Sequence, residues 1–308
     1  KKEEIEKEKK VVVEEINMVL DDPQRYISEL WEKLLYGDQP AGWMISGEKE
    51  TVVKISRQKI LDYFQNQFGA ENVAIVISGN FSEDKVISHA KEFFNFKKVK
   101  PAQKKKVKEV QSKPQILLHF KETDQSHLCL GVRAFDIHSP KKYPLAVLAL
   151  ILGGVMSSRL FIKVREEKAL GYYIQTLAEH YSDTGYLVTR AGIDNKRVFE
   201  AVKIILEEHR NISQKGITEE ELLKAKENIK SHLYLYLETS EAWADYFGIQ
   251  EILGEKTLTP EQKCAMIDKV TQEDVLAVAK EIFQPAKLNL AIIGPFKEKK
   301  EFEKILEI

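Results

Sequence analysis

The chain has 308 residues, of which 43% are hydrophobic, so it is long and apolar enough to bury a sizeable core in about two domains. Its 47 lysines and arginines nearly balance its 48 aspartates and glutamates, giving a net charge of -1. This balance creates no overall field that would attract nucleic acid or an anionic membrane, so neither partner is predicted. The longest apolar run, residues 143–156, is too short to cross a bilayer and predicts a buried helix.

The first segment, residues 3–36, predicts long helices. Ile5 and Ile16 lie on one helical face, and Glu8 and Glu15 fall on the same side when residues are spaced at about 100°. The pattern therefore predicts two carboxylates that point inward, which is costly unless a positive partner compensates them. The alternative interpretation is a solvated face of glutamates and lysines.

The next segment predicts a helix, a strand and a linker. Residues 56–68 predict a helix capped by Ser56, and residues 73–78 predict an apolar strand. Residues 97–114 contain eight lysines and two prolines, and they predict a solvated linker. A nucleic-acid-binding tract is the alternative for this linker, but no aromatic residues interleave with its lysines.

The rest of the chain alternates strands and helices. In chain order, the predicted elements are strands at 115–122 and 127–135, a helix at 144–168, a strand pair at 171–193 that turns near Asp183, helices at 195–212, 218–253 and 271–282, and a strand at 288–294. Cys129 and Cys264 are far apart and lack metal-site spacing, so we expect two buried free thiols. The compartment is left open, with the cytoplasm weakly favoured.

One internal repeat links the two parts of the chain. Residues 56–81 align without a gap with residues 271–296, at an offset of 215 residues (271 − 56). Each copy reads as a capped helix, a strand and a glycine, and long helices precede both copies. The block at about 114–216 precedes only the second copy. The repeat therefore predicts two related units, the first of which lacks roughly a hundred residues on its N-terminal side.

Four stretches resemble the insulinase-like (pitrilysin) zinc metallopeptidases, which include the mitochondrial processing peptidase subunits and small bacterial relatives. The stretches are residues 6–23, 37–81, 152–174 and 258–296. The resemblance implies an α+β fold of two homologous α/β-sandwich domains, each with an antiparallel-rich sheet and helices on one side. It assigns residues 1–96 to the C-terminal part of the first domain, 97–114 to the linker and 115–308 to the second domain.

The family resemblance also implies a zinc site. Members of this family hydrolyse peptides with a zinc ion that is held by His-x-x-Glu-His and by a later glutamate. His-x-x-Glu-His is the inverted motif of inverzincins. The resemblance assigns this third ligand to Glu15, and a supporting catalytic role to Glu8. No His-x-x-Glu-His occurs in these 308 residues, and the family pattern places it upstream of Glu15. We therefore expect this chain alone to bind zinc weakly or not at all and to lack peptidase activity.

The second domain carries the expected substrate-binding residues. Arg165 and Tyr172 match family residues that reach the bound peptide, where a cation and a phenol can grip a carbonyl and stabilise an oxyanion. The alternative is that Arg165 is an ordinary surface charge and that Tyr172 packs within a strand. Gly153 and Gly154 match a loop that lines the peptide chamber, and a tight turn is the equally weighted alternative.

The predicted function is a zinc-dependent endopeptidase that encloses peptides or unfolded polypeptides between two domains, with one zinc ion per complete site. The alternative is a non-catalytic substrate-binding or structural partner subunit of the same family, which could use Arg165 and Tyr172 equally well. A homodimer or a heterodimer with a family member is the expected assembly. The remaining histidines lack ligand spacing and are predicted to be surface or packing residues: His127, His138, His180, His209 and His232.

Overall fold

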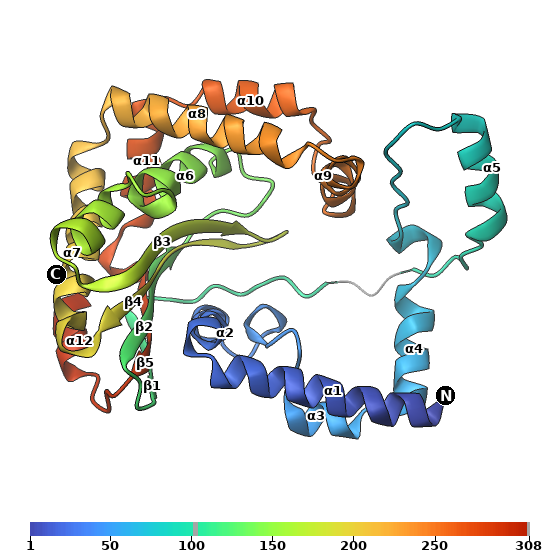
Figure 1. Cartoon of the computed structure of the whole chain (residues 1–308), viewed down its shortest axis with the longest axis horizontal. Helices are drawn as coiled ribbons and strands as arrows, with labels where there is room; N and C mark the ends of the chain where they lie inside the picture. Colours follow the sequence, from blue (N-terminus) through green and yellow to red (C-terminus); the bar gives the residue numbers. More distant parts are fainter. Residues whose placement is uncertain (101–103, 307–308) are drawn as a thin grey trace. The chain divides into compact units, whose positions relative to one another are not determined.

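The computed structural model describes residues 1–100 and 104–306, which divide into two compact units. Unit 1 comprises Lys1–Val13, Glu48–Lys105 and Lys230–Cys264, and unit 2 comprises Glu14–Gly47, Lys106–Ile229 and Ala265–Ile308. Each unit therefore combines segments that are far apart in the sequence (Figure 1). The boundaries expected for the two homologous domains, residues 1–96 and 115–308, remain a prediction.

Unit 2 is built on a five-stranded sheet with the strand order β1-β5-β2-β4-β3. Its strands are β1 (Gln115–Phe120), β2 (Gln125–Arg133), β3 (Gly171–His180), β4 (Gly185–Asp194) and β5 (Leu288–Gly294). β1 and β5 pair in parallel, and the other neighbours are antiparallel. A mixed α/β fold with a mostly antiparallel sheet confirms the predicted fold class.

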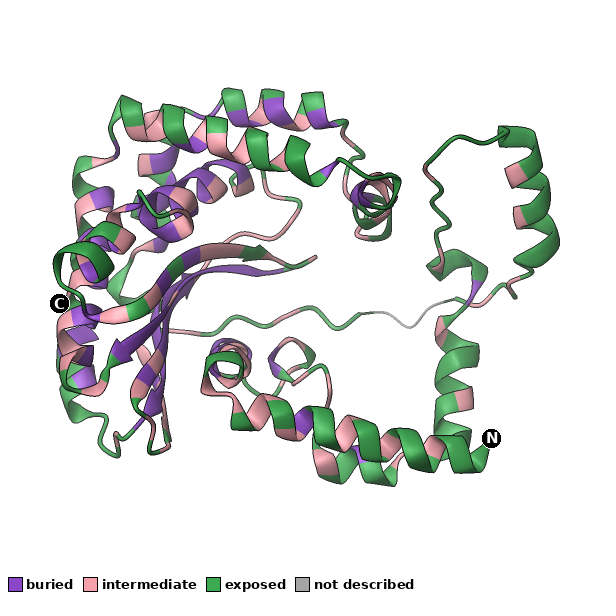
Figure 2. Cartoon of the chain, in the orientation of Figure 1, coloured by how far each residue is buried: buried purple, intermediate pink, exposed green. Residues whose placement is uncertain are grey.

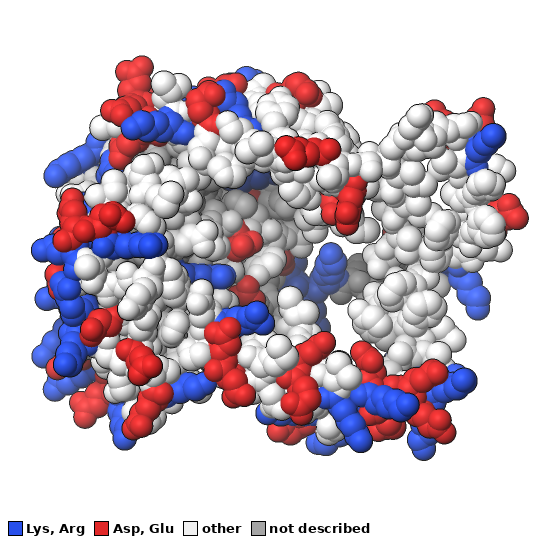
Figure 3. Space-filling view, viewed as in Figure 1, with Lys and Arg blue, Asp and Glu red and all other residues white. Residues whose placement is uncertain are grey.

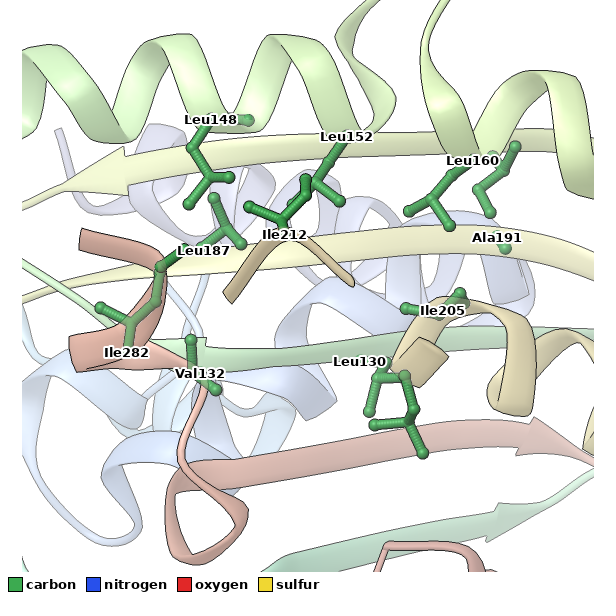
Figure 4. Close-up of a cluster of buried hydrophobic side chains, with 14 of the residues drawn as sticks. Leu130, Val132, Leu148, Leu152, Leu160, Leu187, Ala191, Ile205, Ile212 and Ile282 are labelled. Atoms are coloured by element: carbon green, nitrogen blue, oxygen red, sulfur yellow. The ribbon is translucent and has the colours of Figure 1, made fainter. Parts of the chain in front are cut away.

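One face of this sheet carries the main core of unit 2. The helices that cover it are α6 (Lys142–Ala149), α7 (Val198–Lys215), α11 (Gln272–Ile282) and α12 (Lys300–Leu306). Because side chains alternate along a strand, Leu128, Leu130 and Val132 of β2 all point to this face and are fully buried. Figure 4 shows Leu130 and Val132 within the same cluster as Leu148 and Ile282.

The opposite face of the sheet is also covered by a helix. Helix α2 (Pro23–Tyr36) packs against β1, β2 and β5. Its residues Ile27, Leu30 and Trp31 join Cys129 and Ala291 in a second buried cluster. α2 is separated from α1 (Lys2–Asp21) because the Asp22 side chain caps its first turn and a proline follows.

The predicted single helix over residues 144–168 is wrong. α6 ends at Ala149, a π-helical turn follows at Leu150–Gly154, and a second π-helical segment forms at Phe161–Glu167. The break falls at the glycine pair, where the backbone approaches strand β3 too closely for a side chain.

Unit 1 is helical in its described residues. Besides part of α1, it contains α3 (Lys49–Lys54), α4 (Arg57–Gln67), α5 (Glu83–Phe93), the end of α8 (Glu219–Tyr236), α9 (Ser240–Ile252) and most of α10 (Pro260–Asp268). The strand predicted at residues 73–78 does not form, and Figure 2 shows this connection between α4 and α5 as largely exposed. No strand of the described residues lies beside it to share its backbone hydrogen bonds.

The predicted linker, residues 97–114, forms no helix or strand where it is described, and residues 101–103 lie outside that part. Its second half is held on unit 2: Val107 N–H donates to Asp183 at 2.8 Å, and Lys108 N–H donates to Gln39 at 2.7 Å. These hydrogen bonds attach the second half of the segment to the rest of unit 2.

Cys129 and Cys264 are both free and buried, as predicted. Acidic and basic side chains are interspersed on the face shown in Figure 3, in keeping with the near-zero net charge. Within the described residues, every helix is too short or too polar to span a bilayer.

Candidate functional site

Glu8 and Glu15 both lie on α1, seven residues apart. This spacing puts them on one side of the helix and about 10 Å apart along its axis. Both are exposed, so the prediction that they point inward is wrong for this structure. The reason is that burial on α1 centres on Ile16, and each glutamate lies about 80° to 100° around the helix from it. Neither carboxylate has a hydrogen-bond or ion-pair partner among the described residues.

Arg165 and Tyr172 line one pocket of about 500 Å³ in unit 2. The other lining residues are Asp124, Gln125, Ala169, Leu170, Gly171 and Asp194. The structure thus brings together the arginine and the tyrosine that the sequence singled out. Glu15 is not among the residues that line this pocket.

Two elements position these side chains. Arg165 belongs to the π-helical segment Phe161–Glu167, and its guanidinium lies over the Phe161 ring, 4.9 Å from the ring centroid. Tyr172 lies at the start of β3 and is 77% exposed, so its phenol is available to a ligand. Ala169 connects the two elements with a positive φ of 48°, which lets the chain reverse direction between them.

The pocket also contains two carboxylates that the sequence did not single out. Asp124 and Asp194 are both exposed, and Asp194 accepts a hydrogen bond from Lys196 N–H at 2.7 Å. They are close because β2 and β4 pair with Gln125 opposite Asp194. Only this strand register identifies them, since neither aspartate belongs to a sequence motif. Together the pocket offers donors from Arg165, a phenol, and carboxylate acceptors, which suit the alternating polar groups of a peptide.

The glycine pair has a clear packing role. A Cβ atom on Gly153 would lie 2.4 Å from Thr176 Oγ1 and 2.6 Å from the Thr176 backbone nitrogen. Gly153 is buried, so in this structure it packs against β3 and does not line an open chamber. Gly154 is partly exposed and leads into the exposed turn at Met156 and Ser157.

The described residues do not by themselves make a metal site. Among them, no group of three or more histidine, cysteine, aspartate or glutamate side chains is arranged to hold a metal ion. Zinc sites in proteins take three or four protein ligands, and Glu15 would supply one. Two of the histidines pack or bond within the protein: His127 Nδ1 lies 3.0 Å from the Tyr173 hydroxyl, and His209 stacks on Phe283.

Comparisons with known proteins agree with this architecture. The uncharacterized zinc protease YmxG of Bacillus subtilis is 32% identical over 292 residues, covering 95% of this chain and 71% of the relative. A protease structure from Helicobacter pylori has a TM-score of 0.87 at 19% identity, covering 96% of this chain and 72% of that one. A chain of complex III2 from Candida albicans has a TM-score of 0.86 at 20% identity, covering 97% and 74%.

A family model described as the peptidase M16 inactive domain matches residues 54–229. This match covers more than half of the chain, including the pocket residues Arg165 and Tyr172. The chain therefore belongs to the peptidase M16 family.

Proposed function

We propose that this chain is the peptide-gripping part of a zinc-dependent endopeptidase that acts on peptides or unfolded polypeptides. The observation that carries this proposal is the shared pocket of Arg165 and Tyr172, which opens to solvent and combines donors with acceptors. The name of the Bacillus subtilis relative, a zinc protease, supports the same function.

The pocket residues have separate roles in this proposal. Arg165 donates hydrogen bonds to a peptide carbonyl. The position of its guanidinium over the Phe161 ring limits the directions in which these hydrogen bonds can point. The Tyr172 hydroxyl donates to the oxygen on which negative charge develops during hydrolysis. Asp124 and Asp194 accept hydrogen bonds from peptide N–H groups. Gly154 leads into a turn that borders the bound peptide, and Gly153 fixes this turn against β3.

Glu15 is the proposed zinc ligand of this chain, and Glu8 supports it from the same side of α1. A bound zinc ion would supply activation of the attacking water. The exposed, unpaired state of Glu15 leaves its carboxylate available as a ligand. The remaining ligands, expected from a His-x-x-Glu-His sequence, are not present in this chain.

The pocket can be tested through peptide cleavage by the complete protein that contains this chain and the histidine motif. Tyr172→Phe removes one hydroxyl, so we expect kcat to fall by roughly 10- to 1,000-fold with KM little changed. Tyr181→Phe is a matched control, because Tyr181 donates to Glu32 and does not line the pocket. Unchanged cleavage by Tyr172→Phe would contradict the assigned role.

A second candidate is a non-catalytic substrate-binding or structural subunit that pairs with a family member. The description of the matching family model as an inactive domain favours it, as does the similarity to a chain of a multisubunit complex. In that case the complete protein binds unfolded peptides, and Arg165→Ala weakens this binding, but no zinc-dependent cleavage is detected. Cleavage that a zinc chelator abolishes would exclude this candidate.

A further inference from the structure

The segment Phe161–Glu167, which carries Arg165, is π-helical. π-Helical turns are rare, so this backbone conformation depends on the contacts around it. On the core side, Val164 is fully buried and its carbonyl accepts a hydrogen bond from Leu170 N–H at 2.9 Å. Lys163 and Arg165 are two residues apart, so their side chains leave opposite sides of the segment. Arg165 lines the pocket described above, whereas Lys163 lines a different one.

The carboxylate of Glu208, on α7, is the partner of Lys163. The Glu208 side chain is only 2% exposed. Its Oε1 atom accepts hydrogen bonds from Lys163 Nζ at 2.5 Å and from Asn211 Nδ2 at 3.0 Å. Arg159 Nη1 lies 3.7 Å from Oε2. A buried carboxylate is costly unless it is paired and hydrogen-bonded, and these three partners meet that requirement.

Arg159 connects this carboxylate to a second acid. Its guanidinium donates to Glu221 on α8 at 2.6 Å and 2.8 Å, and to the Gly216 carbonyl at 3.3 Å. Arg159 lies just before the π-helical segment, and Lys163 lies within it. Glu208 therefore contacts side chains on both sides of the point where the segment begins. Because α7 packs on α11 and β4, these contacts attach the segment to the core of unit 2.

Ion pairing, and not close packing, holds this side of the segment. A pocket of about 460 Å³ borders both Lys163 and Glu208, so apolar side chains do not fill the space beside them. The segment contains four charged residues, and within the described part of the chain only Lys163 forms an ion pair. The Lys163–Glu208 pair is thus the polar contact that fixes the segment opposite Arg165.

We propose that Glu208 is a positioning residue for Arg165, an inference that rests on the proposed function of the Arg165 pocket. Glu208 acts through Lys163. Their ion pair fixes the rotation of the segment, and with it the Phe161 ring and the guanidinium that lies 4.9 Å from its centroid. With the pair intact, Arg165 meets a peptide carbonyl in one orientation, and little ordering is left for the binding step. Without the pair, binding has to order the segment first and is weaker.

Binding of fluorescein-labelled β-casein, an unfolded polypeptide, to the complete protein that contains this chain tests the inference. A zinc chelator is present throughout, so that the result does not depend on metal chemistry. Glu208→Gln keeps the shape of the side chain and removes its charge, and it should weaken binding roughly 3- to 10-fold. In an Arg165→Ala background the same substitution should have almost no further effect, because the group that it positions is gone. A purely structural role of Glu208 would weaken binding equally in both backgrounds.

Lys163 provides a second test, since its side chain is 43% exposed and its substitution leaves Glu208 close to Arg159. Lys163→Gln should reproduce the effect of Glu208→Gln. Lys163→Arg keeps the positive charge and should bind as the parent does. Glu220→Gln is the matched control, because Glu220 forms an exposed ion pair with Lys224 on α8 and should leave binding unchanged.

Two results would overturn the positioning role. One is that Glu208→Gln leaves binding unchanged although Arg165→Ala weakens it, or weakens binding equally with and without Arg165. The other is that Lys163→Arg binds as weakly as Lys163→Gln. Unchanged binding by Arg165→Ala is a different result, since it refutes the role of the pocket itself and the inference that depends on it.

Discussion

At the scale of single residues, His209 makes the stability of unit 2 depend on pH. It is buried, neither ring nitrogen has a hydrogen-bond partner among the described residues, and burial lowers the pKa of His209 to about 3. The unfolded chain binds this proton near pH 6.5, but the folded chain binds it only near pH 3. The free energy of unfolding should therefore fall below pH 6.5, by about 1.4 kcal/mol per pH unit from this group.

The substitution His209→Phe should remove this contribution and retain stacking on Phe283. Urea unfolding at pH 7, 6 and 5 measures the difference in free energy between variant and parent, which should grow as the pH falls. His138→Gln is the control, since His138 is exposed. A constant difference between His209→Phe and the parent over this range would show that His209 does not carry the pH dependence.

Ala169 is a second residue whose backbone limits what can replace it. Its φ of 48° is the only positive value among the described non-glycine residues, and it lies between Arg165 and Tyr172 in the pocket. Ala169→Val should lower the free energy of unfolding by about 1–3 kcal/mol, because a branched side chain is strained there. Ala169→Gly should change it by less than about 1 kcal/mol, since relief of strain and loss of chain entropy oppose each other.

Urea unfolding of both Ala169 variants checks this prediction, and peptide binding provides a second readout. If Ala169→Val is as stable as Ala169→Gly, the left-handed conformation is not needed at this position. The sequence contained no signal for the left-handed conformation of Ala169, because alanine rarely adopts this conformation and no turn motif surrounds the residue.

At the scale of elements, Gly153 lets the π-helical segment that follows α6 pack closely against β3. Gly153→Ala should lower the free energy of unfolding by about 1–3 kcal/mol, because its Cβ would meet the Thr176 backbone at 2.6 Å. Gly154→Ala is the matched control: its Cβ would meet the end of the Leu150 side chain at 2.9 Å, which can move. Equal effects of the two substitutions in thermal or urea unfolding would contradict this account.

Helices could be predicted from the sequence where a capping residue and an apolar period lie close together along the chain. The capping hydroxyl of Thr271 and the apolar period that follows it predicted α11, which begins directly after Thr271. Strands were predictable only in part, because a strand needs a neighbour to complete its hydrogen bonds. Residues 73–78 and 288–294 carry similar apolar patterns, but only the latter lie between two other strands.

At the scale of the whole molecule, the sequence indicated the family and the mixed fold. The apolar residues of α2 were visible in the sequence, but periodicity does not reveal which surface a helix covers. α2 packs on the sheet of unit 2, although it precedes the linker. Likewise, Arg165 and Tyr172 were predicted through the family resemblance, but Asp124 and Asp194 meet only through strand register.

We propose that this chain contributes Glu15 to the zinc site of a peptidase. The most direct measurement is the zinc content of the complete protein after dialysis, for the parent and for Glu15→Gln. Glu14→Gln is the control, because Glu14 is also exposed but bonds to Asn17. We predict about one zinc ion per complete site in the parent and in Glu14→Gln, and a loss of at least tenfold in Glu15→Gln. Equal zinc content in all three proteins would contradict the claim.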